Sequence, residues 1–259
     1  MSLYSLRKNF KVQLKTPDKI ITAKAVFKTK ETNWLNTDEP VIIPISIHSA
    51  FHNENQGEIK ISTLVSVIKN HVKGKVTIFM AEKAHTQVLS LKYQGNYQKA
   101  WEECVKSSQL LVDRYQAYFD GCLVLSWSYI EMDRNYEECK KNIVSLSETD
   151  FLFREYLIRD AEDTYTENRI KEFPNRKLYI EKAVKDILEQ CIAQLVMAKK
   201  GYRFLFYPGK SFTSQKYAAT FFAQEGRLSW ISVFLSIEKQ VIHTLKNNES
   251  PTSDFVCAQ

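Results

Sequence analysis

The chain has 259 residues, of which 44% are hydrophobic and 25% charged, and its formal net charge is +6. This length and composition are typical of a soluble globular protein with one large domain or two small ones. Seven glycines, with neither G-x-G-x-x-G nor G-x-x-x-x-G-K present, argue against nucleotide binding by a glycine-rich phosphate loop. The modest positive charge favours a polyanionic partner, although a basic surface without any partner explains it equally well.

The cysteines and the apolar segments bear on the location of the protein. The five cysteines are scattered, and no C-x-x-C or Cys/His pair has the spacing of metal ligands, so we expect reduced thiols in a cytoplasmic protein. His48 and His52 are four residues apart, but they lack the H-E-x-x-H motif, and no metal site is expected. Residues 1–10 lack the apolar core of a signal peptide, and residues 228–237 are about half as long as a bilayer span. We therefore expect no membrane association.

The N-terminal segment is predicted to form a β-hairpin. From Phe10 to Lys30, apolar and polar residues alternate on both sides of a turn at residues 16–19. Its lysines form either a basic strip or an ordinary solvated face.

The next segment is the one around which the rest of the chain is organised. Residues 41–45 are a short apolar run bounded by Pro40 and rich in β-branched residues, which is typical of a strand buried on both faces. The run ends at Ser46, where the chain turns polar. Open α/β sheets bind ligands where a central strand meets its loop, so Ser46 is a candidate nucleophile. A solvated serine at a strand end is the alternative, and from position alone it is the commoner case.

A helix and a second strand complete a βαβ unit. Residues 62–71 have the spacing of an amphipathic helix, and residues 75–80 form another short apolar run. Strand, helix and strand within about 40 residues imply parallel pairing with a right-handed crossover, which would place Ser46 in a crevice. The remaining elements are predicted as helices over 81–118, 123–132, 136–146, 151–169 and 177–200, a strand over 202–207, and a helix–loop–helix over 212–245.

These elements predict an α/β fold with a helical middle. A tetratricopeptide-type array is an alternative, because Gly95-Asn-Tyr97 and Asn135-Tyr136 begin two similar stretches about 39 residues apart. The predicted domains are an N-terminal hairpin extension packed on the domain (1–38), a main domain (39–246) and a flexible tail (247–259).

Three segments, in this order, carry a resemblance to a known family. They are Ile43-Pro-Ile-Ser-Ile-His-Ser-Ala-Phe-His52, Val76-Thr-Ile-Phe-Met-Ala-Glu-Lys-Ala-His85, and the run from Phe151 through Asn168-Arg169 and Asp186-Ile-Leu-Glu-Gln190 to Phe206-Tyr-Pro-Gly209. Together they resemble the tRNA-dependent cyclodipeptide synthases from about residue 41 to residue 210. The last four residues resemble the branch with proline after the active-site tyrosine.

The resemblance implies a single Rossmann-like domain with a central, mainly parallel sheet, similar to the catalytic domains of class I aminoacyl-tRNA synthetases. It implies two aminoacyl-tRNAs as substrates and no cofactor, because the ester linkage already carries the activation. Ser46 would take the first aminoacyl group, and a second charged tRNA would give a dipeptidyl-enzyme that cyclises to a diketopiperazine. Tyr207 matches the active-site tyrosine, whose hydroxyl could bind the reacting groups or relay a proton. A monomer is expected.

The late helix departs from the family pattern Tyr-x-x-x-Glu, which holds the substrate amine. The matching positions are Asp186 and Gln190, four residues apart and so on one helix face. Asp186 could still bind an ammonium group, with Glu189 as a substitute. Pro44 stands where the family usually has glycine beside the pocket. The departures imply a shifted alignment, an altered substrate or a site that no longer turns over.

The resemblance also implies two pockets for substrate side chains and a contact with tRNA phosphates. Asn168 and Arg169 would lie near the second pocket. The first would be lined by Ile42, Pro44, Ala193 and Leu205, for which a core position is an equally good interpretation. The candidate phosphate contacts are Lys69, Lys73 and Lys75; Arg176, Lys177, Lys182 and Lys185; or Lys199, Lys200 and Arg203, each of which could equally be a solvated set.

Three hypotheses for function therefore remain open. The first is an acyltransferase that makes cyclic dipeptides from charged tRNAs through Ser46. The second is a catalytically altered relative that binds aminoacyl-tRNA or a small ligand, suggested by Asp186 and Gln190. The third is a helical protein-interaction module, suggested by the two similar helical stretches.

Overall fold

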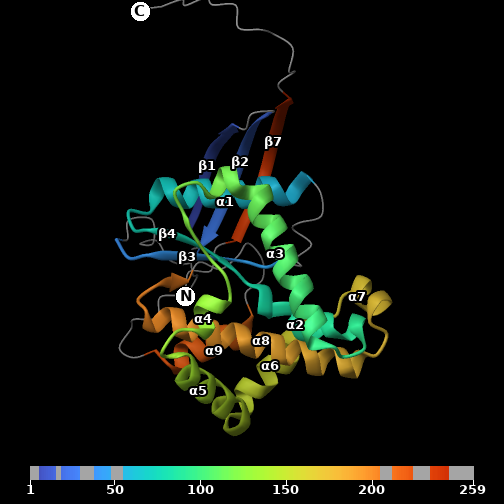
Figure 1. Cartoon of the computed structure of the whole chain (residues 1–259). Helices are drawn as coiled ribbons and strands as arrows, with labels where there is room; N and C mark the ends of the chain where they lie inside the picture. The colour runs from blue at the N-terminus through green and yellow to red at the C-terminus, as the bar shows by residue number, and fades with distance from the viewer. Residues whose placement is uncertain are drawn as a thin grey trace, which may run out of the picture.

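A computed structural model describes residues 6–15, 19–29, 38–47, 55–204, 212–223 and 234–244 (Figure 1). Within these residues the chain forms two β-sheets and a set of helices. The predicted tail, 247–259, lies outside the described residues.

The central sheet is parallel. Its strands are β3 (Val41–Ile45), β4 (Val76–Met80), β5 (Leu123–Leu125) and β6 (Arg203–Phe204). They run in the order β5-β4-β3-β6, and every neighbouring pair is parallel. The predicted α/β fold with a parallel sheet is therefore confirmed.

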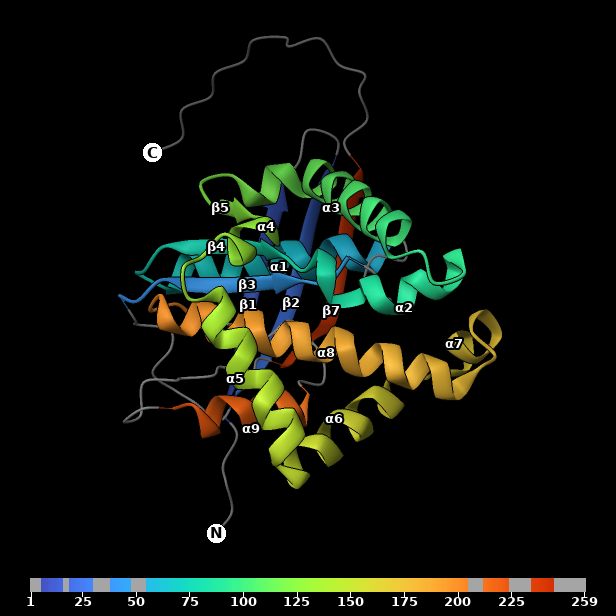
Figure 2. The ribbon, with the colours of Figure 1, turned by 60° about the horizontal axis from the view of Figure 1, so that its bottom comes forward.

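Helices cover both faces of this sheet (Figure 2). They are α1 (Asn55–His71), α2 (Thr86–Ser90), α3 (Tyr97–Phe119), α4 (Ser128–Glu131), α5 (Tyr136–Thr149), α6 (Phe151–Asp163), α7 (Glu167–Glu172), α8 (Arg176–Lys199) and α9 (Thr213–Phe221), with short 3-10 helices η3 (Glu82–His85) and η4 (Leu91–Tyr93). Helices α1 and α3 lie on one face, and α8, with α5, α6 and α9 against it, lies on the other. Asn96, Asp150 and Asn175 cap α3, α6 and α8, because each side chain accepts a hydrogen bond from the backbone amide three residues later.

Strand β3 is buried on both faces, as its unbroken apolar run predicts. Val41, Ile43 and Ile45 pack in one hydrophobic cluster with side chains of α1 and α3. Ile42 packs in a second cluster with side chains of α8. Since side chains alternate along a strand, even-numbered positions of β3 face α8, and Ser46 continues that side.

The second sheet is antiparallel and joins the two ends of the described chain. Strands β1 (Leu6–Lys15) and β2 (Lys19–Thr29) form the predicted hairpin, and β7 (Phe234–Thr244) pairs along β2. Helix α1 lies against all three strands. The helix–loop–helix predicted for 212–245 is therefore wrong in its second half: α9 is a helix, but 234–244 is a strand, because β2 offers it an open edge to pair with.

Two further predictions about the helices are wrong in detail. Residues 123–132 were expected to be one helix, but 123–125 form β5 at the edge of the sheet, paired with β4. Residues 151–169 were expected to be one helix, but α6 ends before Thr164 and α7 begins after Thr166, whose backbone is extended with φ −77° and ψ 168°. Two β-branched threonines in three residues weaken the helix there.

The parallel sheet also contradicts a purely helical repeat array. The sheet separates the two similar helical stretches, because α3 packs in the cluster on one face and α5 in the cluster on the other. In the part of the chain that the structure describes, no helix is long and apolar enough to cross a membrane. Among the same residues, no group of three or more His, Cys, Asp or Glu side chains is placed to hold a metal ion.

Candidate active site

The candidate nucleophile contacts a histidine that comes from the neighbouring strand. Ser46 Oγ and His85 Nε2 lie 2.5 Å apart, and this contact is partly buried. Ser46 directly follows β3, and His85 ends η3, which begins two residues after β4. Because β3 and β4 are parallel, with Ile45 opposite Met80, their carboxyl ends bring the two side chains together.

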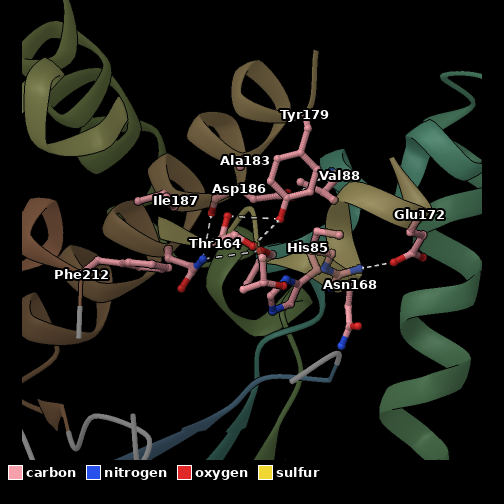
Figure 3. A pocket seen from close by; sticks show the side chains of 14 residues that line it. His85, Val88, Thr164, Asn168, Glu172, Tyr179, Ala183, Asp186, Ile187 and Phe212 are labelled. Atoms are coloured by element: carbon pink, nitrogen blue, oxygen red, sulfur yellow. Dashed lines mark hydrogen bonds and ion pairs between the residues drawn. The ribbon is translucent and has the colours of Figure 1, made fainter. Parts of the chain in front are cut away.

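His85 also lines a cavity of about 480 Å³ (Figure 3). The cavity opens between the η3–α2 segment, the α6–α7 connection, α7, α8 and the residue before α9. Most of its wall is polar. The lining residues are Ala84, His85, Val88, Thr164, Thr166, Asn168, Arg169, Glu172, Tyr179, Ala183, Asp186, Ile187, Gln190 and Phe212.

Asp186 connects α8 to the segment that carries the histidine. Its side chain is 3% exposed, and its two carboxylate oxygens accept hydrogen bonds from the backbone amides of Gln87 (2.8 Å) and Val88 (2.9 Å). Burial raises the pKa of this carboxyl to about 8. The hydrogen bonds from the two backbone amides oppose this shift, because they stabilise the ionised form. Asp186 therefore caps the start of α2 in place of a side chain at the cap position itself.

Gln190, one turn further along α8, also faces the cavity. Its side-chain nitrogen lies 3.5 Å from the carbonyl oxygen of Ala84 and 3.3 Å from that of Asp186, and its side-chain oxygen accepts from Gln215 at 3.3 Å. The predicted shared face of Asp186 and Gln190 is therefore observed, and both side chains contact protein groups around the cavity.

The rest of the polar wall combines an aromatic cluster with an ion pair. The Tyr179 hydroxyl lies 3.1 Å from the Thr164 hydroxyl and 3.2 Å from its carbonyl oxygen, and the Tyr179 ring packs on Tyr165 with centroids 4.8 Å apart. Arg169 donates to Glu172 at 2.7 Å. Because this ion pair is internally neutral, the wall offers hydrogen-bonding groups and little net charge.

The predicted substrate-binding residues separate into two groups. Asn168 and Arg169 line the same cavity as Asp186 and Gln190, although they come from a different helix. The other described candidates lie in the packed interior or its rim: Ile42 is 0% and Ala193 2% exposed in the second hydrophobic cluster, and Pro44 is partly buried in β3. Ile42 and Ala193 therefore lie in the hydrophobic core.

Glu189 points away from the cavity. It lies 3.4 Å from Lys83, whose ammonium group also contacts Glu131 at 2.7 Å. Burial alone would lower the pKa of Lys83, but the two carboxylates outweigh this effect and raise the pKa above its usual value. Three residues after Asp186 on a helix of 3.6 residues per turn, Glu189 is rotated about 60° from it, so it faces η3 and α4 instead.

Tyr207 and Leu205 lie outside the described residues, as do His48 and His52. The roles predicted for Tyr207 and Leu205 stay predictions. Among the candidate phosphate contacts, the last set is engaged in ion pairs: Lys199 with Glu138 (2.7 Å), Lys200 with Asp133 (2.5 Å) and Arg203 with Glu39.

Sequence reasoning missed His85 and Tyr179. His85 follows a predicted strand by five residues, and the rule that carboxyl ends of adjacent parallel strands converge would have paired it with Ser46. Tyr179 precedes Asp186 by seven residues, which is two helical turns, so the spacing alone places both on one face.

Solved structures with similar folds are cyclodipeptide synthases (CDPSs). A CDPS from Fluoribacter dumoffii matches 82% of this chain and 98% of its own, with a TM-score of 0.71 and 14% sequence identity. The cyclodipeptide synthase from Candidatus Glomeribacter gigasporarum, solved bound to Phe-tRNAPhe, matches 83% of this chain and 95% of its own, with a TM-score of 0.60 and 16% identity. One from Bacillus thermoamylovorans matches 78% and 90%, with a TM-score of 0.53 and 16% identity.

No protein-family model matches the sequence, and no curated protein sequence does either. The chain thus has the CDPS fold, which resembles the catalytic domains of class I aminoacyl-tRNA synthetases, with a sequence far from those of the solved structures.

Proposed function

We propose that this chain is a tRNA-dependent cyclodipeptide synthase, an aminoacyltransferase that joins the aminoacyl groups of two charged tRNAs into a diketopiperazine. The observation that carries the proposal is the position of Ser46. It directly follows a central parallel strand in a fold whose solved relatives are CDPSs, and it contacts a histidine that lines a polar cavity.

The geometry suits acyl transfer from an ester that is already activated. Ser46 Oγ would attack the carbonyl carbon of the first aminoacyl ester, and the 3′ oxygen of the tRNA would leave. The amine held on the enzyme would then attack the carbonyl carbon of a second aminoacyl-tRNA ester, the 3′ oxygen of that tRNA would leave, and a dipeptidyl-enzyme would form. Attack of the new terminal amine on the Ser46 ester would close the ring and free the serine.

The cavity is proposed to hold an aminoacyl group during these steps. Its volume of about 480 Å³ is ample for an amino-acid side chain, and its wall offers the hydroxyl of Tyr179 and the amides of Asn168 and Gln190. A substrate ammonium group would favour the ionised form of Asp186, and the second lone pairs of that carboxylate remain the proposed contact for it, beside the backbone amides that the carboxyl already binds. Tyr207 is proposed to serve the reacting groups, as the resemblance implies.

The proposed partner is aminoacyl-tRNA. The Candidatus Glomeribacter gigasporarum enzyme, of the same fold, was solved bound to Phe-tRNAPhe, which supports this proposal. Lys199, Lys200 and Arg203 are paired with carboxylates, and Arg176 is paired with Glu162 at 2.6 Å. The lysines of the other two sets are therefore the better candidates for phosphate contacts.

Incubation with a mixture of radiolabelled aminoacyl-tRNAs tests the proposal. Diketopiperazine products that form with the wild type and are absent with Ser46→Ala are the expected result. Omitting one amino acid at a time from the mixture then identifies the two that are joined. Linear dipeptides only, or products unchanged in Ser46→Ala, would contradict it.

One observation favours a second candidate, a relative that binds charged tRNA without turnover. The carboxyl of Asp186 accepts two backbone amides and stands where the family pattern has a group for the substrate amine. The same incubation separates the two candidates, because retention of labelled aminoacyl-tRNA on the protein without any diketopiperazine would support the second.

A further inference from the structure

We propose that His85 is a catalytic residue, the general base and acid that moves the proton of Ser46. This inference rests on the proposed function for its substrate, but the Ser46–His85 pair can be tested without tRNA.

The first support is contact and placement. The 2.5 Å between Ser46 Oγ and His85 Nε2 is hydrogen-bond distance, and 39 residues of chain separate the two. His85 also lines the cavity, so one imidazole touches the nucleophile and faces the space proposed for the substrate (Figure 3). A general base has to reach both the proton it takes and the leaving group that receives it.

The second support is that the segment carrying His85 is held from several sides. On one side of His85, the buried Glu82 accepts hydrogen bonds from the Ser108 hydroxyl and the Trp127 amide, both at 2.9 Å. On the other side, the Asp186 carboxyl accepts hydrogen bonds from the backbone amides of Gln87 and Val88.

A hydrogen bond between η3 and α2 also holds this segment. Thr86, the next residue, donates from its hydroxyl to the Glu82 carbonyl at 3.2 Å. Four hydrogen bonds to two buried carboxyls thus fix the backbone around one histidine, which is the preorganisation that proton transfer needs.

The proton balance of the reaction needs a group at this place. As the bond from Ser46 Oγ to the substrate carbonyl carbon forms, the hydroxyl proton passes to Nε2, and the ring becomes a cation. When the carbon–oxygen bond to the tRNA breaks, the proton passes from Nε2 to the departing 3′ oxygen, which leaves as a hydroxyl. In ring closure the path runs backwards: Nε2 takes a proton from the attacking amine and returns it to Ser46 Oγ. This role requires the neutral tautomer with its proton on Nδ1.

The test uses a fluorophosphonate, a probe that reacts with activated serines and needs no tRNA. Ser46 Oγ attacks phosphorus, fluoride leaves, and the serine proton passes to His85. The labelling rate of Ser46 is measured by peptide mass spectrometry in the wild type, His85→Ala and His85→Gln. Ser46→Ala gives the background. His71→Ala is the matched control, because His71 lies at the end of α1 and contacts its own helix at the Val67 carbonyl.

We expect labelling of Ser46 in the wild type and in His71→Ala, and a rate lower by about 10²–10⁴-fold in both His85 variants. Thermal unfolding followed by circular dichroism should be unchanged in His85→Gln. Added imidazole should restore part of the rate in His85→Ala, which a structural role would not produce. The proposal is overturned by an unlabelled wild type, by a His85 variant within threefold of the wild-type rate, or by a loss that imidazole does not reverse.

Parallel measurement of diketopiperazine synthesis separates this inference from the proposed function. Labelling that depends on His85, without diketopiperazine from any charged tRNA, would support the pair and contradict the synthase. Diketopiperazine that requires Ser46 but forms at the wild-type rate in His85→Gln would support the synthase and overturn the role of His85.

Discussion

Replacing Asp186 with asparagine should change how the stability of the protein depends on pH. The side chain is 3% exposed, and its burial raises the carboxyl pKa to about 8 in the folded state, while in the unfolded chain it is about 3.9. Between these values the folded protein keeps a proton that the unfolded chain has released. The stability of the wild type therefore falls as pH rises from about 4 to 8, whereas Asp186→Asn has no carboxyl to titrate there.

The magnitude follows from the linkage of one proton. The slope is at most about 1.4 kcal/mol per pH unit, so between pH 5 and pH 7 the wild type should lose up to about 2.7 kcal/mol relative to Asp186→Asn. At pH 5 the variant should be the less stable, because an amide NH₂ faces one of the two backbone amides and leaves it without an acceptor, at a cost of about 1–3 kcal/mol.

Urea unfolding of both proteins at pH 5, 6, 7 and 8, followed by circular dichroism, measures this difference. Asp113→Asn, at an exposed position of α3, controls for the general effect of removing a carboxylate. A difference between wild type and Asp186→Asn that stays constant from pH 5 to 8, or that grows in favour of the wild type, would show that the two amides hold the carboxyl ionised and would refute the reasoning.

Two further changes test the close approach at Gly74 and the cap of α3. In Gly74→Ala, the new Cβ would lie 1.9 Å from the backbone oxygen of Glu39, so the chain before β3 must shift; we expect a loss of at least about 2 kcal/mol in urea unfolding, and a midpoint equal to the wild type would contradict the close approach. In Asn96→Ala, the amide of Lys99 loses its 3.1 Å acceptor at the start of α3; the expected loss is about 1 kcal/mol, and no change in thermal unfolding would show that the cap contributes nothing.

The helices and strands that the sequence alone predicted are those whose pattern of apolar residues fits only one kind of secondary structure. Residues 41–45 are apolar at every position, which suits a strand that packs on both faces between two layers of helices. The hairpin before it alternates over residues 10–15 and returns as a second extended run after a turn. By contrast, residues 234–244 contain Ile237, Val241 and Ile242 at a spacing that suits a helix as well as a strand, and pairing with a strand more than 200 residues earlier decides the outcome.

The candidate site was predictable to the extent that sheet topology determines it. Ser46 followed from the end of a buried strand. Asp186 and Gln190 were named from the family resemblance, and helical spacing only placed them on one face of their helix. The engagement of Asp186 with the amides of Gln87 and Val88 was not predictable, because those backbone groups come from a segment 99 and 98 residues away along the chain. Contacts of that kind depend on how α8 crosses the strand ends, which no local pattern encodes.

Capture of the covalent intermediate on Ser46 tests most directly whether this serine is the nucleophile. Wild-type protein is mixed with a single charged tRNA, quenched in acid within seconds and digested for mass spectrometry. The peptide containing Ser46 should gain the mass of one aminoacyl group as an ester, and the corresponding peptide of Ser46→Ala should gain none. Diketopiperazine synthesis at an undiminished rate in Ser46→Ala, or an aminoacyl ester found on another residue, would contradict this role of Ser46.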